Sequence, residues 1–123
     1  MMKYFLIVGI GSFFGGGFRF LVQQYLTEKA GNGFPFGTLV VNIAGSFILG
    51  MLFALANKTN LISNELRLLL ATGFCGGFTT FSTFSLENIN MLRDGQIFNV
   101  FLYTGVSIFF GFFATYLAIQ LFK

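Results

Sequence analysis

Four long apolar stretches occupy most of the sequence and constrain its fold more than any other feature. They run from about residue 4 to 26, 36 to 56, 66 to 91 and 97 to 122. A helix needs about 20 apolar residues to cross a bilayer, so each stretch is long enough to span one. Only 9% of the residues are charged, against about 25% in an average soluble domain. The sequence therefore predicts an all-α integral membrane protein, with residues 1–123 forming a single domain of four transmembrane helices.

The residues that are missing exclude several classes of chemistry. The chain has no histidine and a single cysteine, Cys75, so disulfide frameworks, zinc sites, haem ligation and histidine-based catalysis have almost nothing to use. Its Ser and Thr hydroxyls have no histidine to activate them, and we expect no enzyme. The seven Lys/Arg and four Asp/Glu residues stand singly, a pattern that gives no footprint for nucleic acid.

The charges outside the apolar stretches specify orientation only weakly. Four spans would place both termini on one side of the membrane. The basic residues expected on that side are Lys3, Lys58, Arg67 and Lys123, and those expected on the other side are Lys29 and Arg93. Four against two is a thin margin for the positive-inside rule. The sequence therefore allows insertion in both orientations.

Arg19 is the residue of the first stretch that is least suited to a bilayer. It follows Gly11 and Gly15 and precedes Gln23, all at four-residue spacing and so on one helical face. Arg19 is either an arginine that extends to the membrane surface or a cation that faces a watery cavity, where it attracts an anion or supports the structure. The two glycines form a small-residue face that lets another helix approach closely.

Asn42 lies in the middle of the second stretch, with Thr38 and Ser46 on the same helical face. An amide group carries two N–H donors and one oxygen acceptor. Asn42 can therefore hold an anion or bridge two helices, and the segment alone favours neither interpretation.

The third stretch is the least helix-favouring of the four. Gly76 and Gly77 are followed by the β-branched residues Thr79 and Thr80, which together make poor helix in the middle of a span. The pattern predicts a helix that is broken at its midpoint. Lipid cannot satisfy the backbone groups that such a break frees, so the break must be buried in protein, line a cavity or bind an ion. Discontinuous helices at mid-membrane are where transport proteins often place ion sites.

Aromatic, hydroxyl and acidic side chains follow this break. Phe81 and Phe84 share a helical face, and Ser82 and Thr83 lie between them in sequence. Ring edges carry the positive part of the aromatic quadrupole, so ordered edges can replace part of the water around a small anion. Because the chain contains 20 Phe residues, core or lipid contact is the simpler interpretation of two of them. One turn beyond, Glu87 is either a carboxylate at the end of the span or a partner for an arginine.

Three segments of the sequence resemble signatures of the small dual-topology fluoride channels, the Fluc or CrcB family. Residues 11–20 are similar to the first-helix pattern of that family, and residues 37–42 followed by Gly45 resemble its second-helix signature. Residues 73–87 resemble the third, with the core Gly-Gly-x-Thr-Thr-Phe-Ser-Thr-Phe intact. The resemblance covers all four spans, and its departures from the first-helix pattern are Ser12, Gly16 and Phe20.

The resemblance implies a fluoride-selective ion channel in the inner membrane, which lets cytoplasmic fluoride leave passively down its electrochemical gradient. It also implies an antiparallel homodimer with two pores and a structural sodium ion at the dimer centre, held by the backbone carbonyls of Gly76 and Thr79. Phe81 and Phe84 would line the pores, and Asn42 would donate to fluoride.

The remaining polar residues complete the pathway that the resemblance implies. The track opposite the rings would consist of Thr38, Ser82, Thr83 and Tyr103, and the residues with vestibule or structural roles would be Arg19 and Glu87. Fluoride is strongly hydrated, so a path through a low-dielectric region must replace the lost water with other donors. Uncharged donors suit this task because they bind the ion weakly enough to release it.

Two other classes of protein stay open. A proton-coupled small multidrug transporter also has four short helices, but it needs a carboxylate embedded in the membrane. The first stretch carries Arg19 instead, and Glu87 is the only acid within the four stretches. A structural or assembly subunit would need only glycine-rich helix faces, and it would not need a polar, broken third helix.

Overall fold

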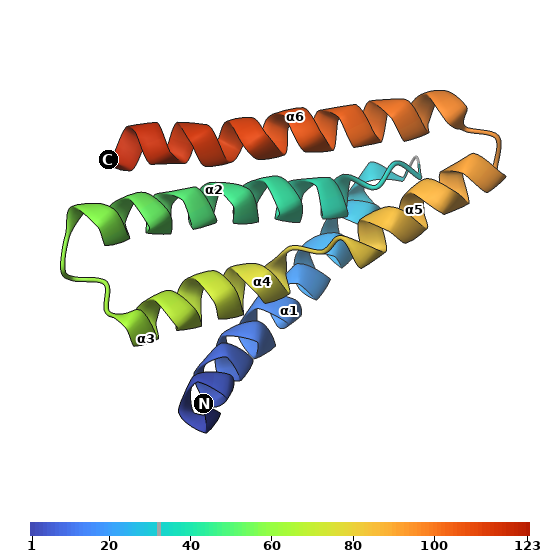
Figure 1. Cartoon of the computed structure of the whole chain (residues 1–123). Coiled ribbons are helices and arrows are strands. Elements are labelled where there is room, and N and C mark those ends of the chain that lie inside the picture. Colours follow the sequence, from blue (N-terminus) through green and yellow to red (C-terminus); the bar gives the residue numbers. More distant parts are fainter. Residues whose placement is uncertain (32) are drawn as a thin grey trace.

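The computed structural model describes residues 1–31 and 33–123, and every regular element in these residues is a helix. Helix α1 spans Met2–Ala30 and α2 spans Phe36–Lys58. A path of shorter elements follows: α3 (Asn64–Arg67), the π-helix η1 (Leu68–Cys75), α4 (Gly76–Phe78) and α5 (Ser82–Arg93), and the chain ends in α6 (Ile97–Phe122). Helices α2 and α6 lie side by side, the path from α3 to α5 runs along them in the opposite direction, and α1 crosses this path obliquely (Figure 1).

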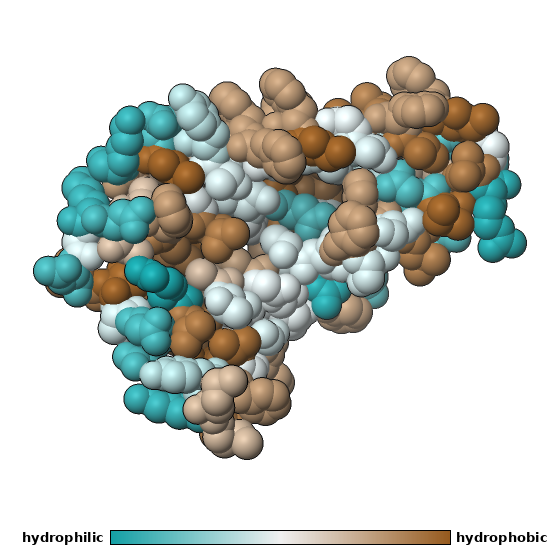
Figure 2. Space-filling model, in the orientation of Figure 1, coloured by the Kyte–Doolittle hydropathy of each residue, from teal (hydrophilic) through white to brown (hydrophobic). Residues whose placement is uncertain are grey.

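Three helices of the described residues are long and apolar enough to cross a membrane, namely α1, α2 and α6. They correspond to the first, second and fourth predicted stretches. The stretch predicted at residues 66–91 is divided among α3, η1, α4 and α5, each of which is shorter than a span. Large apolar side chains are exposed along all three long helices, and hydrophilic residues gather mainly toward the left and right ends of the view in Figure 2. Such a surface suits lipid, and the all-α membrane class is confirmed.

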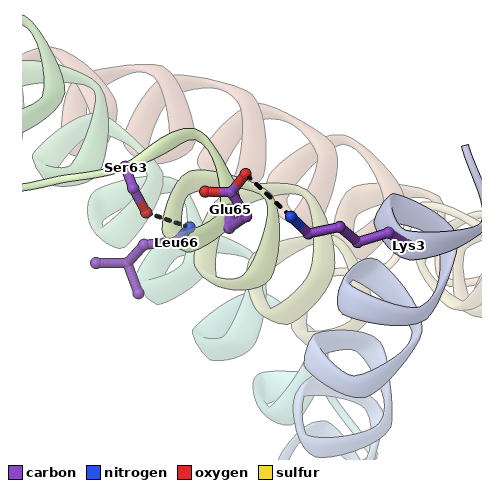
Figure 3. Close-up of polar contacts among 4 residues, drawn as sticks. All are labelled: Lys3, Ser63, Glu65 and Leu66. Atoms are coloured by element: carbon purple, nitrogen blue, oxygen red, sulfur yellow. Dashed lines mark hydrogen bonds and ion pairs between the residues drawn. The ribbon is translucent and has the colours of Figure 1, made fainter.

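Two polar contacts fix the start of the α3 to α5 path beside the N-terminus. The Ser63 side chain caps α3 by accepting a hydrogen bond from the Leu66 backbone N–H at 3.1 Å (Figure 3). Glu65 then forms an ion pair with Lys3 of α1, with 3.8 Å between the charged atoms. Both side chains are exposed, so the pair contributes about 1 kcal/mol or less. The main attachment of α1 lies elsewhere.

Glycines let the backbone of α1 meet the backbone of η1 and α4 directly. A Cβ atom at Gly11 would overlap the Leu69 carbonyl oxygen, and one at Gly15 would overlap the Phe74 carbonyl oxygen. From the other side, a Cβ atom at Gly77 would lie 2.7 Å from the Ser12 carbonyl oxygen. The close approach expected of the glycine face in the first stretch is therefore confirmed.

The helical path is not continuous between α4 and α5. Gly76 and Gly77 lie within α4, and the backbone becomes extended at Thr79, with φ −93° and ψ 159°. Helix α5 begins three residues later, at Ser82. The two glycines are helical, and the second of them packs against α1. The chain leaves the helix at the β-branched residues that follow them.

Candidate functional site

A groove of about 740 Å³ opens beside residues 79–81. These residues join α4 to α5 without helical structure, and we call them the extended segment after the extended backbone at Thr79. Residues of α2, η1, α4, α5 and α6 line it. Five of the residues predicted for the site are among them: Asn42, Gly76, Thr79, Phe81 and Phe84. The structure therefore brings the predicted ion-binding carbonyl residues and the predicted rings to one concave surface.

The side chain of Asn42 on α2 forms hydrogen bonds with the backbone of the extended segment. Its Nδ2 donates to the Thr80 carbonyl oxygen at 3.1 Å, and its Oδ1 accepts from the Thr80 backbone N–H at 2.8 Å. In a continuous helix that N–H would donate to the Gly76 carbonyl. The amide thus replaces the helical hydrogen bond that the extended segment gives up, and it acts as a bridge between helices. One of its two N–H donors remains for another acceptor.

Side-chain hydroxyls stabilise both ends of the extended segment. The Thr79 hydroxyl donates to the Cys75 carbonyl at 2.9 Å, and a Cβ atom at Gly45 of α2 would overlap the Thr79 methyl group. The Thr80 hydroxyl oxygen accepts from the Thr83 backbone N–H at 3.2 Å in the first turn of α5. It also lies 3.3 Å from the Ser82 hydroxyl. These bonds give the segment a defined structure.

Three aromatic rings form a row that leads from the groove into the protein. The centroids of Phe81 and Phe84 are 5.8 Å apart, and those of Phe84 and Tyr103 are 4.9 Å apart. Phe81 is 77% exposed, whereas Tyr103 of α6 is fully buried. The row thus connects the open groove to a second group of polar residues, of which Thr38 and Tyr103 are buried.

This second group surrounds the carboxylate of Glu87. The Tyr103 hydroxyl donates to Glu87 Oε1 at 2.8 Å, and the Thr38 hydroxyl donates to Glu87 Oε2 at 3.0 Å. Thr38 is 1% exposed and accepts a hydrogen bond from Gln23 Nε2 at 3.0 Å. The predicted polar track is therefore divided: Thr38 and Tyr103 lie at the carboxylate, and Ser82 and Thr83 lie beside the extended segment.

Arg19 points into the bundle. Its Nε donates to the Gly77 carbonyl oxygen at 3.0 Å, and its Nη1 donates to Gln23 Oε1 at 3.4 Å. Within residues 1–31 and 33–123, the ion pair that forms is the one between Lys3 and Glu65. Arg19 is therefore connected to Glu87 only through Gln23 and Thr38.

Two residues of the site have functions that the sequence pattern did not assign. Gln23 joins Arg19 to Thr38, and Thr80 joins Asn42 to the start of α5. The four-residue spacing from Arg19 to Gln23 was a signal for the first of them, because it places both side chains on one face. Nothing in the spacing of Thr80 indicated that its backbone would bind an amide from another helix.

Comparison with known proteins identifies the family. The model of the family described as CrcB-like protein, Camphor Resistance (CrcB), matches residues 6–119. The chain belongs to the CrcB family. A CrcB relative from Chlorobium phaeobacteroides strain BS1, named fluoride-specific ion channel FluC, is 52% identical over 96% of this chain and 91% of its own length. A protein of the same name from Gloeothece citriformis is 47% identical over 99% of this chain and 98% of its own.

A third relative of that name, from Chlorobium luteolum, is 50% identical over 93% of this chain and 88% of its own length. These CrcB relatives are named as ion channels and not as enzymes, in agreement with the expectation that this chain is not an enzyme. Together with the three helices that can cross a membrane, the CrcB family identifies the chain as a multi-pass protein of the bacterial inner membrane. The resemblance noted in the sequence is confirmed.

Proposed function

We propose that this CrcB protein is a fluoride-selective ion channel that lets cytoplasmic fluoride leave the cell passively. The observation that carries the proposal is the extended segment at residues 79–81, which Asn42 holds open beside a groove that two aromatic rings line. Relatives that are about half identical over most of the chain and are named fluoride-specific channels support it.

The groove provides donors without a formal charge. Fluoride loses its water when it enters a low-dielectric region, and that loss must be offset by other groups. The second N–H of Asn42 and the edges of Phe81 and Phe84 lie at the groove. The Ser82 and Thr83 hydroxyls follow Phe81 in the first turn of α5. Weak binding by several such groups favours conduction because the ion can leave each of them.

We propose that the path from α3 to α5 crosses the membrane as one span interrupted at residues 79–81, which gives a single domain of four transmembrane helices. The path runs along α2 and α6, both of which are long enough to cross (Figure 1). Because the groove is open and Phe81 is 77% exposed, one copy does not enclose a pathway. An antiparallel second copy of the chain would cover the groove and complete the pores.

A structural sodium ion would be held by the carbonyl oxygens of Gly76 and Thr79. Both residues line the groove, and the Thr80 N–H that would bind the Gly76 carbonyl in a helix donates to Asn42 instead. Carbonyl oxygens suit a hard cation of this kind. When bound, the ion would neutralise part of the negative potential of these carbonyls at the centre of the dimer.

The experiment that tests the function is fluoride efflux from liposomes that contain the purified protein. Fluoride and chloride electrodes record release in parallel, with protein-free liposomes as the control. We expect rapid fluoride release and negligible chloride release. Proton-dependent uptake of an organic cation without fluoride release would support the small multidrug transporter instead, and the absence of both fluxes would leave the structural-subunit interpretation.

A further inference from the structure

A series of hydrogen bonds connects Arg19, which points into the bundle, to the half-buried carboxylate of Glu87. Arg19 donates to Gln23, Gln23 donates to Thr38, and Thr38 donates to Glu87, with donor–acceptor distances of 3.4, 3.0 and 3.0 Å. Every bond in this chain is donated in the same direction, from the cation toward the anion. Chains of this kind polarise one another and act as a unit. They also hold each member in one orientation.

Within this series of hydrogen bonds, Gln23 is the residue that links α1 to α2. Its amide oxygen faces Arg19 of its own helix and its amide nitrogen faces Thr38 of the next. The amide can make both bonds only in this orientation, because the oxygen accepts and the nitrogen donates. Reversal of the amide would break both.

The backbones of α1 and α2 come into close contact at Gln23 and Gly37. A Cβ atom at Gly37 would lie 2.7 Å from the Gln23 Cα and 3.1 Å from its carbonyl oxygen. Only glycine at position 37 lets α1 come this near, and the next residue of α2 is Thr38, the partner of the amide. The backbone contact therefore brings the Gln23 side chain within reach of Thr38.

We propose that Gln23 is a positioning residue for fluoride passage: through Thr38 it keeps the Glu87 carboxylate docked in place. This inference rests on the proposed channel function. Glu87 lies one helical turn beyond Phe84, whose ring contacts that of Tyr103. A carboxylate that is free to move toward these rings would repel fluoride, since like charges a few ångströms apart repel strongly in a low-dielectric region. Donors on both carboxylate oxygens prevent that movement.

The test compares fluoride efflux from liposomes for the wild type and two near-isosteric variants. Gln23→Met removes both amide bonds, and Gln23→Glu keeps an acceptor for Arg19 but loses the donor to Thr38. We expect the maximal efflux rate of both variants to fall about tenfold, the upper end of the effect of losing one hydrogen bond, because both variants lose the donor to Thr38. The matched control is Gln24→Met, because Gln24 is the exposed neighbour of Gln23 on α1; it should conduct at the wild-type rate.

A double-mutant cycle separates positioning from a general loss of structure. If Gln23 acts through Thr38, the double variant Gln23→Met/Thr38→Val should conduct no more slowly than Thr38→Val alone, since both changes remove the same bond. The proposal would be overturned if the slowing of efflux in the double variant were the product of the slowing in the two single variants. It would also be overturned if a Gln23 variant that elutes like the wild type in gel filtration released fluoride at the wild-type rate. Failure of the wild type itself to release fluoride would instead refute the channel function, so the two failures are distinct.

Discussion

Replacement of Asn42 is the most direct test of how the extended segment is maintained. Asn42→Leu keeps the approximate size of the side chain and removes the amide. The Thr80 N–H and carbonyl then both lose their partner, since each is bound to this amide at 2.8 and 3.1 Å. An unsatisfied buried polar group costs about 1–3 kcal/mol, so the two together cost about 2–6 kcal/mol.

This loss should be visible in thermal unfolding of the purified protein in detergent. At about 4 °C per kcal/mol for a chain of this size, Tm should fall by about 8 °C or more, and fluoride efflux should fall with it. Asn90→Leu is the control, because Asn90 is exposed on α5, and its Tm should stay near that of the wild type. An Asn42→Leu variant that unfolds at the wild-type temperature would refute the view that the amide holds the extended segment.

Three further outcomes are expected. Gly15→Ala should lower the free energy of unfolding by about 1–3 kcal/mol, because its Cβ would overlap the Phe74 carbonyl. The control Gly16→Ala should leave the free energy of unfolding almost unchanged, because its Cβ meets nothing within 4 Å. Equal Tm values for the two variants would contradict the packing of α1. Phe81→Ile or Phe84→Ile should slow fluoride efflux strongly without changing the elution volume of the protein, since each keeps an apolar side chain but loses the ring edge. Wild-type efflux rates in both variants would show that the rings have no part in conduction. Replacement of sodium by a larger monovalent cation should weaken the dimer or the efflux if carbonyls hold a sodium ion, and unchanged behaviour on both measurements would count against the metal site.

The long helices could be predicted from the sequence because length and hydropathy decide them. The stretch expected at residues 97–122 coincides with α6, and those expected at 4–26 and 36–56 lie within α1 and α2. The helix ends extend further because a few polar residues continue the backbone hydrogen bonding until a residue such as Gly31 ends it, with φ at 64°. Pattern alone could not set those ends.

The partners within the site were much harder to predict. Two glycines followed by β-branched residues were expected to break the third stretch; Gly76 and Gly77 are helical, and the helical path is interrupted just after them, at Thr79. The pattern identified Asn42, Glu87 and Tyr103 as polar residues in or near spans. Their partners come from other helices, and distances between helices are not encoded in the spacing of one segment.

The contact of α1 with η1 and α4 is made by main chain against main chain, at Gly11, Gly15 and Gly77. An interface without intervening side chains has no alternative rotamers, and packed surfaces of this kind are not continuously deformable. These elements therefore pack as one rigid body. The main chain turns away from this body at two non-helical joints, residues 79–81 and 94–96, and at the first of them Asn42 fixes the turn through its two hydrogen bonds to Thr80.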